Sequence, residues 1–322
     1  MHGITATNVN TAFSAGLHWL RVAGELEDSR NGKVLVAPEP VCTTYKNPAE
    51  RVLFSPERDA NPYFHLMEGI WMLAGRGDLA SIEQFNKGMA KYSDDGKGLN
   101  GAYGWRWRGM FGFDQLTEVV NELSINPTSR RCVLAMYDPV WDMQDNPESL
   151  DIPCNTHIYF DCRHNKLNMT VCCRSNDAIW GAYGANAVHM SMLMEYIATA
   201  IGLPLGDYRQ ISNNFHAYIE VEGVEALIRF PHSENLYRTE GFEPYPMVSN
   251  PVLFLKDCEL FCENPLLNRQ PHNPFFDDVA RPMFKSWTER KAGKNDGLSA
   301  LAYCKAEDWK YACEQWILRR VK

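Results

Sequence analysis

One thiol and one arginine have the chemistry and the spacing needed for covalent catalysis on an anionic small molecule. Cys154 follows a proline in residues 151–155, and Arg174 and Ser175 come about twenty residues later. A thiolate attacks carbon readily once nearby cations lower the pKa of the thiol. Arginine presents a planar fork of donors that matches a phosphate group. The pair therefore predicts nucleophilic chemistry on a phosphorylated substrate.

The spacing of the ten cysteines indicates free thiols and no metal site. No paired set of cysteines has the two-residue spacing of a zinc site. Cys258 and Cys262 are four residues apart on a predicted helix, but no pair of histidines lies near them in sequence. In a reducing compartment we expect most of these thiols to be buried as small apolar side chains.

Composition limits the class of protein. The chain has 322 residues, of which 45% are hydrophobic and 12% aromatic, enough for a sizeable core. A net charge of −8 argues against a direct nucleic-acid partner. No apolar run approaches the ~20 residues of a membrane span, and the N-terminus lacks a signal segment. We expect a soluble, cytoplasmic protein with no membrane partner.

Apolar periodicity predicts the elements that must position these side chains. Helical spacing occurs in three segments: 62–76, 114–124 and 186–202. The last of them is apolar on most sides, which predicts a buried helix. Alternating β-branched, aromatic and cysteine residues predict three strands: 131–138, 156–163 and 167–173.

The C-terminal third is expected to differ in character. Short strands near 208–213 are followed by a helix from about residue 215. Proline-rich loops through 274 then lead to amphipathic helices near 275–290 and 298–320. Because helices and strands alternate irregularly, we predict an α+β fold with a mixed β-sheet layered by helices. We expect a catalytic domain at 1–255 and a C-terminal loop and helical extension at 256–322, packed on it.

Further motifs surround the thiol and the arginine, and they follow one another in a recognisable order. Along the chain they are Glu68-x-x-Trp71; Gly101-Ala102-Tyr103-Gly104 with Trp107-Arg108; Asn126-Pro127-Thr128-Ser129-Arg130-Arg131; Pro153-Cys154 with Arg174-Ser175-x-Asp177, Gly181 and Asn186; and His216-Ala217-Tyr218. This series resembles the thymidylate synthase family, which includes the pyrimidine-nucleotide hydroxymethylases. The resemblance covers roughly residues 20 to 255.

The resemblance implies a mechanism. Cys154 would add to C6 of a pyrimidine nucleotide, which makes C5 reactive toward the one-carbon unit of 5,10-methylenetetrahydrofolate. Glu68 and Tyr103 would handle protons, and Asn186 would hold the base. The exocyclic methylene that results can end in two ways. Hydride from the folate gives a methyl group, and addition of water gives a hydroxymethyl group.

The resemblance also implies binding roles. Phosphate would be bound by Arg174, Ser175 and Arg30, and by Arg130 and Arg131 donated from the partner in a homodimer. The sugar would be bound by His216 and Tyr218. The folate would be bound by Asp177 and Trp71. Two other histidines, His157 and His189, match no motif, and we expect structural roles for them.

The base is predicted from one side chain. An asparagine amide can accept from uracil N3–H and donate to O4, whereas a carboxylate suits cytosine better. Asn186 therefore favours dUMP over a cytidine nucleotide. One extra residue stands between Gly181 and Asn186 relative to the family pattern, so the approach to this asparagine differs.

Several departures from the family pattern bear on how the reaction ends. Met89 stands where a shielding tryptophan is usual, and Tyr92 is the nearest aromatic residue. Asn155 and Tyr159 replace a usual histidine and glutamine, and residues 319–322 form no apolar latch. Such a site would admit water more readily. We therefore favour hydroxymethylation of dUMP over methylation.

Three alternatives stay open from the sequence. They are a methylating thymidylate synthase, a dCMP or CMP hydroxymethylase, and an inactive nucleotide-binding homologue. Altered pyrimidines are typical of some bacteriophage genomes, so a viral source acting in the host cytoplasm would fit the preferred interpretation.

Overall fold

The computed structural model describes residues 1–267, 272–294 and 296–321, and these are built around one mixed sheet. The strands are β1 His2–Ala6, β2 Glu25–Ser29, β3 Gly32–Val36, β4 Val41–Tyr45, β5 Val133–Ala135, β6 Asn155–Arg163, β7 Lys166–Asp177 and β8 Leu205–Tyr218. They lie in the order β1-β4-β8-β7-β6-β5, and the β2–β3 hairpin joins β8 through β3. Two pairs, β1–β4 and β7–β8, are parallel, and the other pairs are antiparallel.

Helices cover one face of this sheet. They are α1 Val9–Ala23, α2 Pro62–Leu73, α3 Leu79–Glu83, α4 Tyr103–Trp105, α5 Gln115–Ile125, α6 Asn186–Ala200, α7 Val224–Arg229, α8 Leu236–Thr239, α9 Pro251–Glu263, α10 Arg281–Lys291, α11 Leu298–Leu301 and α12 Glu307–Leu318. Short 3₁₀ or π turns are η1 Lys87–Tyr92, η2 Arg106–Met110, η3 Val140–Asp145, η4 Ala178–Ala185 and η5 Phe276–Ala280. None of the helices in the described ranges is long and apolar enough to cross a membrane.

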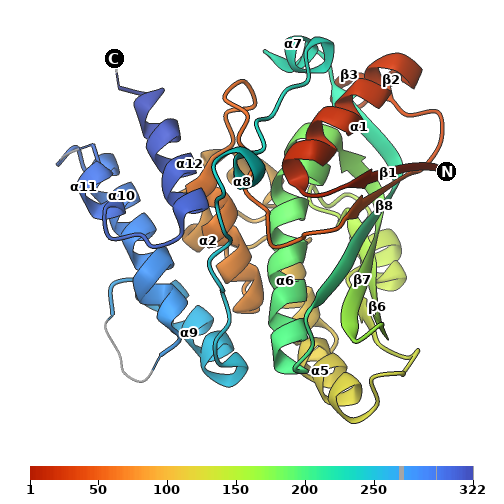
Figure 1. Cartoon of the computed structure of the whole chain (residues 1–322). Helices are drawn as coiled ribbons and strands as arrows, with labels where there is room; N and C mark the ends of the chain where they lie inside the picture. Colours follow the sequence, from red (N-terminus) through yellow and green to blue (C-terminus); the bar gives the residue numbers. More distant parts are fainter. Residues whose placement is uncertain (268–271, 295, 322) are drawn as a thin grey trace.

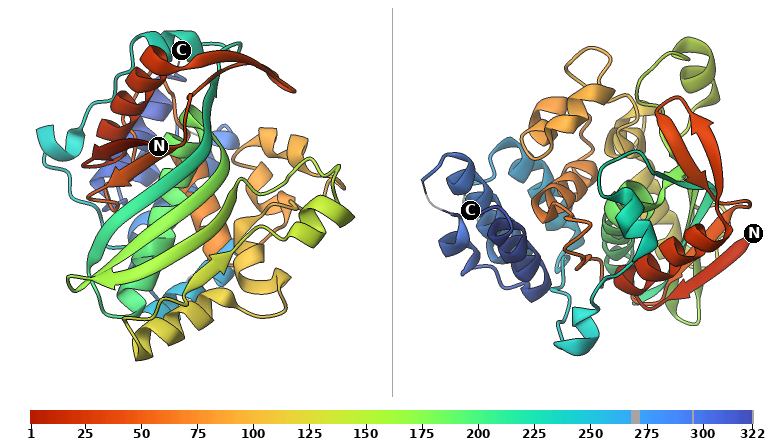
Figure 2. Two further views of the ribbon diagram at one scale, coloured as in Figure 1. Left: turned by 90° about the vertical axis from the view of Figure 1, so that its right-hand side faces the viewer. Right: turned by 90° about the horizontal axis from the view of Figure 1, so that it is seen from above.

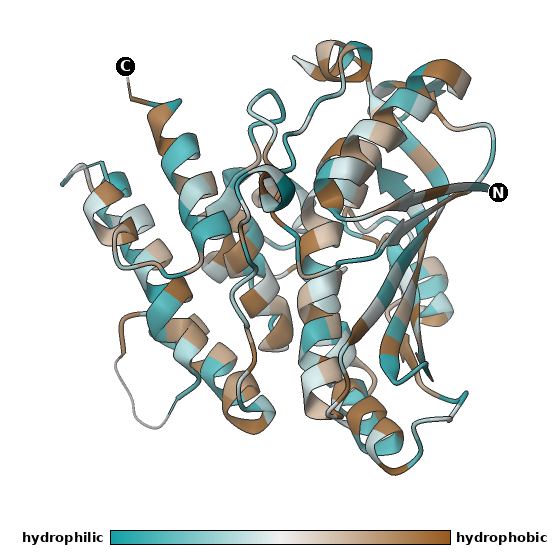
Figure 3. Ribbon diagram, in the orientation of Figure 1, coloured by the Kyte–Doolittle hydropathy of each residue, from teal (hydrophilic) through white to brown (hydrophobic). Residues whose placement is uncertain are grey.

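The layers follow from which faces are apolar. Helix α6 lies between the sheet and α2, and helices α9, α10 and α12 pack beyond α2 (Figure 1). Because α6 lies between two layers, most of its side chains are buried, including the polar Asn186, His189 and Ser191. Helices α10 and α12 carry both hydrophilic and hydrophobic residues (Figure 3), as amphipathic outer helices do.

The sheet has a covered face and an open face. In the left view of Figure 2 the long strands β6, β7 and β8 face the viewer, and the helices lie behind them. Burial alternates accordingly, since Met169 and Val171 of β7 are fully buried whereas Thr170 and Cys172 are only half-buried. On β8 the outward Ile211 is likewise half-buried. An α+β fold with a mixed sheet layered by helices is therefore confirmed.

Most of the predicted elements are found, and four need correction. Helices α2, α5 and α6 and strands β6 and β7 match their predicted segments. The helix expected from residue 215 is wrong, because Phe215, His216 and Ala217 continue β8 and pair with β7 and β3. A short apolar run does not distinguish a strand from a helix, and here pairing with non-adjacent strands decides.

The other three corrections are differences of extent. Only Val133–Ala135 of the segment 131–138 pairs as a strand. Helix α9, with Asn250 as its cap and Pro251 at its first position, occupies part of the expected loop region. The segment 298–320 is two helices, α11 and α12.

The C-terminal extension is fastened to α2. The Tyr63 hydroxyl lies 2.7 Å from Ser286 Oγ of α10, and both atoms are buried. Arg319 and Arg320, after α12, both form ion pairs with Asp59 in the loop before α2. Helix α9 begins before residue 255 and ends after it, so one helix spans the boundary that we expect between the two parts.

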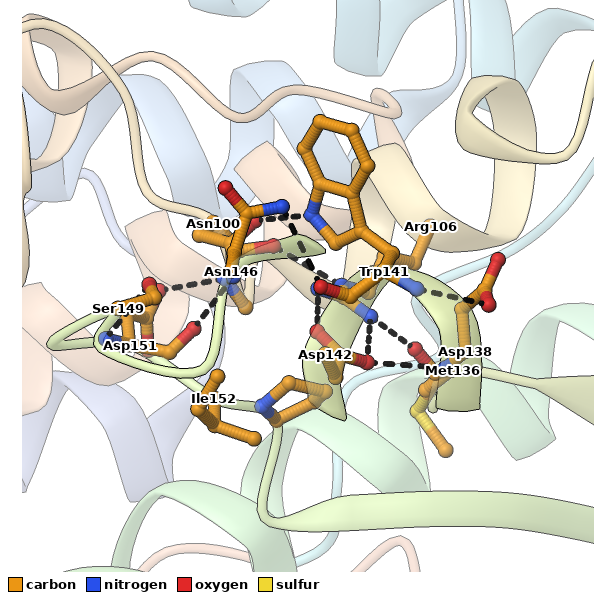
Figure 4. Close-up of polar contacts among 12 residues, drawn as sticks. Asn100, Arg106, Met136, Asp138, Trp141, Asp142, Asn146, Ser149, Asp151 and Ile152 are labelled. Atoms are coloured by element: carbon orange, nitrogen blue, oxygen red, sulfur yellow. Dashed lines mark hydrogen bonds and ion pairs between the residues drawn. The ribbon is translucent and has the colours of Figure 1, made fainter. Parts of the chain in front are cut away.

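A buried ion pair holds the loop that leads to β6. Figure 4 shows Arg106 facing Asp142 of η3. Arg106 Nη1 and Nη2 each donate to one oxygen of Asp142 over 2.7 Å, and both side chains are fully enclosed. Arg106 also donates to the carbonyl oxygens of Asn100 and Met136. This one guanidinium therefore joins the 100–106 segment, the end of β5 and the turn η3.

The same segment fixes the residues just before Cys154. The Asp151 carboxylate accepts from the Gly101 backbone N–H over 2.7 Å, and Asn100 Nδ2 donates to the Asp151 carbonyl oxygen (Figure 4). Trp141 Nε1 donates to Asn100 Oδ1 over 2.7 Å. The conformation of residues 136–153 thus depends on the segment that carries Tyr103.

We predict that Asp142→Asn lowers the free energy of unfolding by about 3 kcal/mol or more, because Arg106 then keeps a buried charge without its partner. The measurement is urea unfolding followed by circular dichroism. Asp28→Asn is the matched control, since Asp28 pairs with Lys33 on the exposed β2–β3 hairpin and should change stability little. Equal effects of the two substitutions would contradict a special role for the buried pair.

Candidate active site

Cys154 lies directly before β6, and Arg174 of β7 hydrogen-bonds with the backbone of the Cys154 loop. The Arg174 backbone N–H donates to the Cys154 carbonyl oxygen over 2.9 Å. Its side chain donates from Nε to the Pro153 carbonyl oxygen and from Nη2 to that of Ile152. The predicted pair of thiol and arginine is therefore one local unit, with the arginine oriented by the backbone of the nucleophile loop.

Nearby groups shift the pKa of the Cys154 thiol in opposite directions. Burial raises the pKa of Cys154, the nearby Arg174 and Arg30 lower it, and Asp151 raises it. Arg30 lies in the turn of the β2–β3 hairpin, so two separate parts of the chain bring positive charge toward the sulfur. A buried thiol ionises only when cations compensate for lost solvation. The site therefore needs both arginines, and further cations would help.

Tyr103 of α4 reaches the backbone beside the nucleophile. Its hydroxyl oxygen accepts from the Asn155 N–H over 3.1 Å. Burial raises the pKa of Tyr103 well above its usual range, and Cys154 and Cys173 raise it further. The phenol therefore stays protonated and holds a hydrogen atom next to the thiol.

A chain of buried amides runs from the nucleophile loop to β8. Asn155 Nδ2 donates to Asn186 Oδ1 over 2.9 Å, and Asn186 Nδ2 donates to Asn176 Oδ1 over 3.1 Å. Asn176 Nδ2 in turn donates to Ser212 Oγ over 2.8 Å. All four side chains are buried. Since each amide is held by the next, Asn186 has a fixed orientation with one lone pair and one N–H left over.

The π turn η4 lies directly before Asn186 and accommodates the extra residue expected there. Such turns accommodate one additional residue relative to a regular helix. Within η4, Gly184 has non-helical φ and ψ of −115° and −110°. Tyr183 fills the space beside Gly16 and places its hydroxyl 3.2 Å from Thr43 Oγ1. The altered sequence approach to Asn186 thus still brings it to Asn155.

Glu68 of α2 is a buried acid at the same site. Burial raises its pKa to about 8, and Asp151 contributes in the same direction. Its Oε2 atom lies 3.1 Å from Nε2 of His189 on α6. The carboxyl group is therefore protonated at neutral pH and can act as an acid.

The predicted sugar and folate residues lie at the ends of β7 and β8. Asp177 pairs in register with His216, and the rings of His216 and Tyr218 meet edge to face with centroids 5.1 Å apart. His216 Nδ1 lies 2.7 Å from Asn214 Oδ1. Asp177 Oδ1 accepts from the backbone N–H groups of Ile179 and Trp180, so this residue also caps η4.

Four of the predicted site residues have fewer contacts with the rest of the site. Ser175 is half-buried on β7, and its carbonyl oxygen accepts from the Cys173 thiol over 3.0 Å. Arg130 and Arg131 are exposed, and their side chains contact no site residue within the described chain. Trp71 is 3% exposed in the core, and its Nε1 donates to the Asp78 carbonyl oxygen, so the structure gives it a packing role and no contact at the site.

The sequence patterns did not predict Asp151 at this site, and they indicated Tyr92 only as the aromatic residue nearest to the shielding position. Asp151 is a largely enclosed carboxyl group that raises the pKa of Cys154, Glu68 and Tyr103. Tyr92, at the end of η1, is half exposed, and its pKa is raised by burial and by Tyr218, Asp151, Cys154 and Asp177. The position of Asp151 three residues before the nucleophile was the available signal. Nothing in the sequence placed Tyr92 there except its aromatic character.

Within the described residues, no three His, Cys, Asp or Glu side chains gather as metal ligands do. The groups that could do chemistry are thus a thiol, two arginines, a protonated acid, a phenol and an oriented amide. Together they provide a nucleophile, an anion site and proton donors around one small volume. This set suits covalent addition to an electron-poor ring that carries a phosphate.

Comparisons with known proteins agree with this chemistry. The thymidylate synthase family model matches residues 57–239. A deoxyuridylate hydroxymethyltransferase of Pseudomonas phage M6 is 43% identical over 99% of this chain and 95% of its own length. Another, from Bacillus phage SP01, is 36% identical over 60% of this chain and 53% of its own length.

A solved structure shows the same fold at low identity. Thymidylate synthase from T4 phage superposes with a TM-score of 0.57 and 19% identity, over 67% of this chain and 79% of that one. The family model covers more than half of the chain, and the Pseudomonas phage relative covers almost all of it. The chain therefore belongs to the thymidylate synthase family.

Proposed function

We propose that this protein transfers a one-carbon unit from 5,10-methylenetetrahydrofolate to C5 of dUMP and releases 5-hydroxymethyl-dUMP. The observation that carries the proposal is the 43% identity, over nearly the full length of both chains, to a deoxyuridylate hydroxymethyltransferase. Two further phage relatives have the same activity in their names. The geometry around Cys154 supports the covalent mechanism.

In the first step the Cys154 sulfur bonds to C6 of the pyrimidine. The electron pair of the C5–C6 double bond moves toward O4, and the resulting enolate makes C5 nucleophilic. Arg174 and Arg30 support the thiolate, because both lower the pKa of Cys154. They also supply positive charge for the phosphate of the nucleotide, together with the hydroxyl of Ser175.

Asn186 recognises the base in this proposal. Its amide is oriented by Asn155 and Asn176, which leaves one lone pair for uracil N3–H and one N–H for O4. Cytosine presents the opposite pattern, with an acceptor at N3 and an amino group at C4. The orientation of the amide chain therefore supports a uracil base.

The residues beside Asp177 fit a pterin ring. Trp180 is 46% exposed, its backbone N–H donates to the Asp177 carboxylate, and Arg58 stacks on its ring, so a carboxylate and a partly exposed indole come from one turn. A carboxylate can accept from the N–H groups of a pterin, and an exposed indole can stack on its face. When bound, methylenetetrahydrofolate supplies the one-carbon unit at the oxidation level of formaldehyde.

Two observations support addition of water to the exocyclic methylene as the step that forms the product. Met89 stands where a shielding ring is usual, and the nearest aromatic residue, Tyr92, is half exposed and carries a polar hydroxyl group. Arg319 and Arg320 are held by Asp59, so the end of the chain is fastened to the loop before α2. An accessible methylene carbon is a site for attack by water.

A homodimer completes the phosphate site in this proposal. The open face of the sheet carries half-buried Thr170, Cys172 and Ile211, which a second copy could cover. Arg130 and Arg131 are exposed and contact no site residue of their own described chain. Donation of both arginines to the partner's site would add positive charge where burial raises the pKa of Cys154.

We predict that incubation with dUMP and methylenetetrahydrofolate yields a nucleotide heavier by one CH₂O unit, with tetrahydrofolate as co-product. Mass spectrometry and folate absorbance measure the two products. Cys154→Ala should lower the rate at least about 1000-fold, because it removes the nucleophile. Cys262→Ala, which removes a half-buried thiol of α9, is the control. A gain of CH₂ with dihydrofolate would instead identify a methylating synthase.

We predict that Asn186→Asp lowers kcat/KM for dUMP by about 100-fold, since the carboxylate offers no donor to O4 and faces Asn176 Oδ1. The relative rate with dCMP should rise. Steady-state kinetics with both nucleotides measure the change, and Asn213→Asp at an exposed position of β8 is the control. An unchanged rate with dUMP would count against the assigned role of Asn186.

We predict that two inactive variants, Cys154→Ser and the double variant Arg130→Ala with Arg131→Ala, restore activity when mixed. Random exchange of subunits leaves about one quarter of the sites with a thiol and the partner's arginines. The measurement is product formation after unfolding and refolding the mixture. No recovery, while size-exclusion chromatography still shows mixed dimers, would place the arginines in their own subunit's site or outside any site.

A further inference from the structure

Glu68 has a neighbour that no motif predicted. Helices α2 and α6 cross at Gly69, where a Cβ atom would stand 2.4 Å from Met192 Sδ. Because glycine allows this close crossing, Glu68 Oε2 on α2 reaches to 3.1 Å from His189 Nε2 on α6. His189 is 3% exposed, so the contact is enclosed.

Neither atom has a hydrogen-bond partner in the described chain, and both are buried. Each therefore faces the other as the nearest group with which it can exchange a proton. His189 also hydrogen-bonds with the backbone of His65, which occupies its other ring nitrogen. The Glu68 side chain is 12% exposed although its Oε2 atom is enclosed, so part of the carboxyl group keeps access to solvent.

The proton between the two atoms belongs to Glu68. Burial raises the pKa of Glu68 to about 8 and lowers the pKa of His189 to about 3. The charged and titratable neighbours favour the same protonation states. Asp151 raises the pKa of Glu68, and the ring of His65, which has Arg58 near it, lies next to His189. The 3.1 Å contact therefore brings a neutral acid and a neutral imidazole together, with the proton of Oε2 within reach of Nε2.

We propose that His189 is the positioning residue for Glu68 and forms a proton relay with it: Nε2 of His189 takes the proton from Oε2 of Glu68 while Oε1 takes a proton from the site. The inference rests on the proposed function, because it assigns the pair to the addition of water. The relay lets a buried carboxyl group accept a proton without first standing as an isolated anion.

In the step concerned, the oxygen of water bonds to the exocyclic methylene carbon. The electron pair of that double bond moves into the ring to form the O4 enolate, and one proton of the water passes to Glu68 Oε1. The proton of Oε2 moves to His189. Expulsion of the Cys154 thiolate then restores the C5–C6 double bond. Glu68 Oε1 then gives its proton to the departing Cys154 sulfur, and His189 returns its proton to Oε2, so both groups regain their starting states. Because burial disfavours the charged imidazole, His189 holds the proton only during this step.

The test measures how the methylene intermediate is divided between two nucleophiles. An added thiol such as 2-mercaptoethanol competes with water for the exocyclic carbon and gives a thioether. In His189→Leu the addition of water slows, so the ratio of thioether to hydroxymethyl product should rise about tenfold or more. Ser191→Ala, another buried polar side chain of α6 that bonds only to the Val188 carbonyl oxygen, is the control.

The ratio does not depend on how much of each variant is folded, so a structural defect alone would not move it. An unchanged ratio in both His189→Leu and the less disruptive His189→Gln would overturn the relay. Infrared spectra of the free protein give a second measurement that requires no turnover. At neutral pH a protonated carboxyl band should be present, lost in Glu68→Gln and shifted in His189→Leu.

The two readouts separate the relay from the proposed function. If the product is dTMP, the assignment to water addition fails while the infrared band still reports the shared proton. If Glu68 is ionised in the free protein, the relay is wrong whatever the product.

Discussion

The buried ion pair between Arg106 and Asp142 is the contact on which the site depends. It is the point where the segment that carries Tyr103, the end of β5 and the loop that leads to Cys154 come together. A pair without access to solvent tolerates little displacement, because each charge then lacks compensation. The nucleophile loop, which has no regular structure just before β6, therefore takes its conformation from an electrostatic contact and not from packing alone.

Burial creates a second constraint, since it opposes the ionisation on which the chemistry depends. The pKa of Cys154 is raised by burial, and only Arg174 and Arg30 among its neighbours counteract this. The same burial is useful at Glu68, where it keeps the acid protonated. Cys154 thus needs cations near its sulfur, whereas Glu68 needs none near its carboxyl group. The fold meets both needs by bringing the arginines from β7 and from the β2–β3 hairpin, while Glu68 comes from α2.

Much of this arrangement could be predicted from sequence because the motifs are local. The helix that carries Glu68 follows a short-range apolar pattern and was found as predicted, and the structure places Arg174 against the backbone of the Cys154 loop. The strand at 215–218 could not be predicted in this way, because its conformation depends on pairing with β3 and β7, which are distant in sequence. His189 was missed for the same reason. Its role depends on a helix crossing at Gly69, and no pattern within α6 indicates which residue it meets.

The difference between a methyl and a hydroxymethyl product need not lie in the nucleophile. Attack by Cys154 is common to both outcomes, and they part only at the exocyclic methylene. What then matters is whether water can reach that carbon and whether a nearby group can take its proton. In this chain Asp151, Tyr92 and the Glu68–His189 pair are ionisable groups near that machinery. The outcome is then set by a few ionisable side chains at the edge of the site, on a fold that is otherwise that of the family.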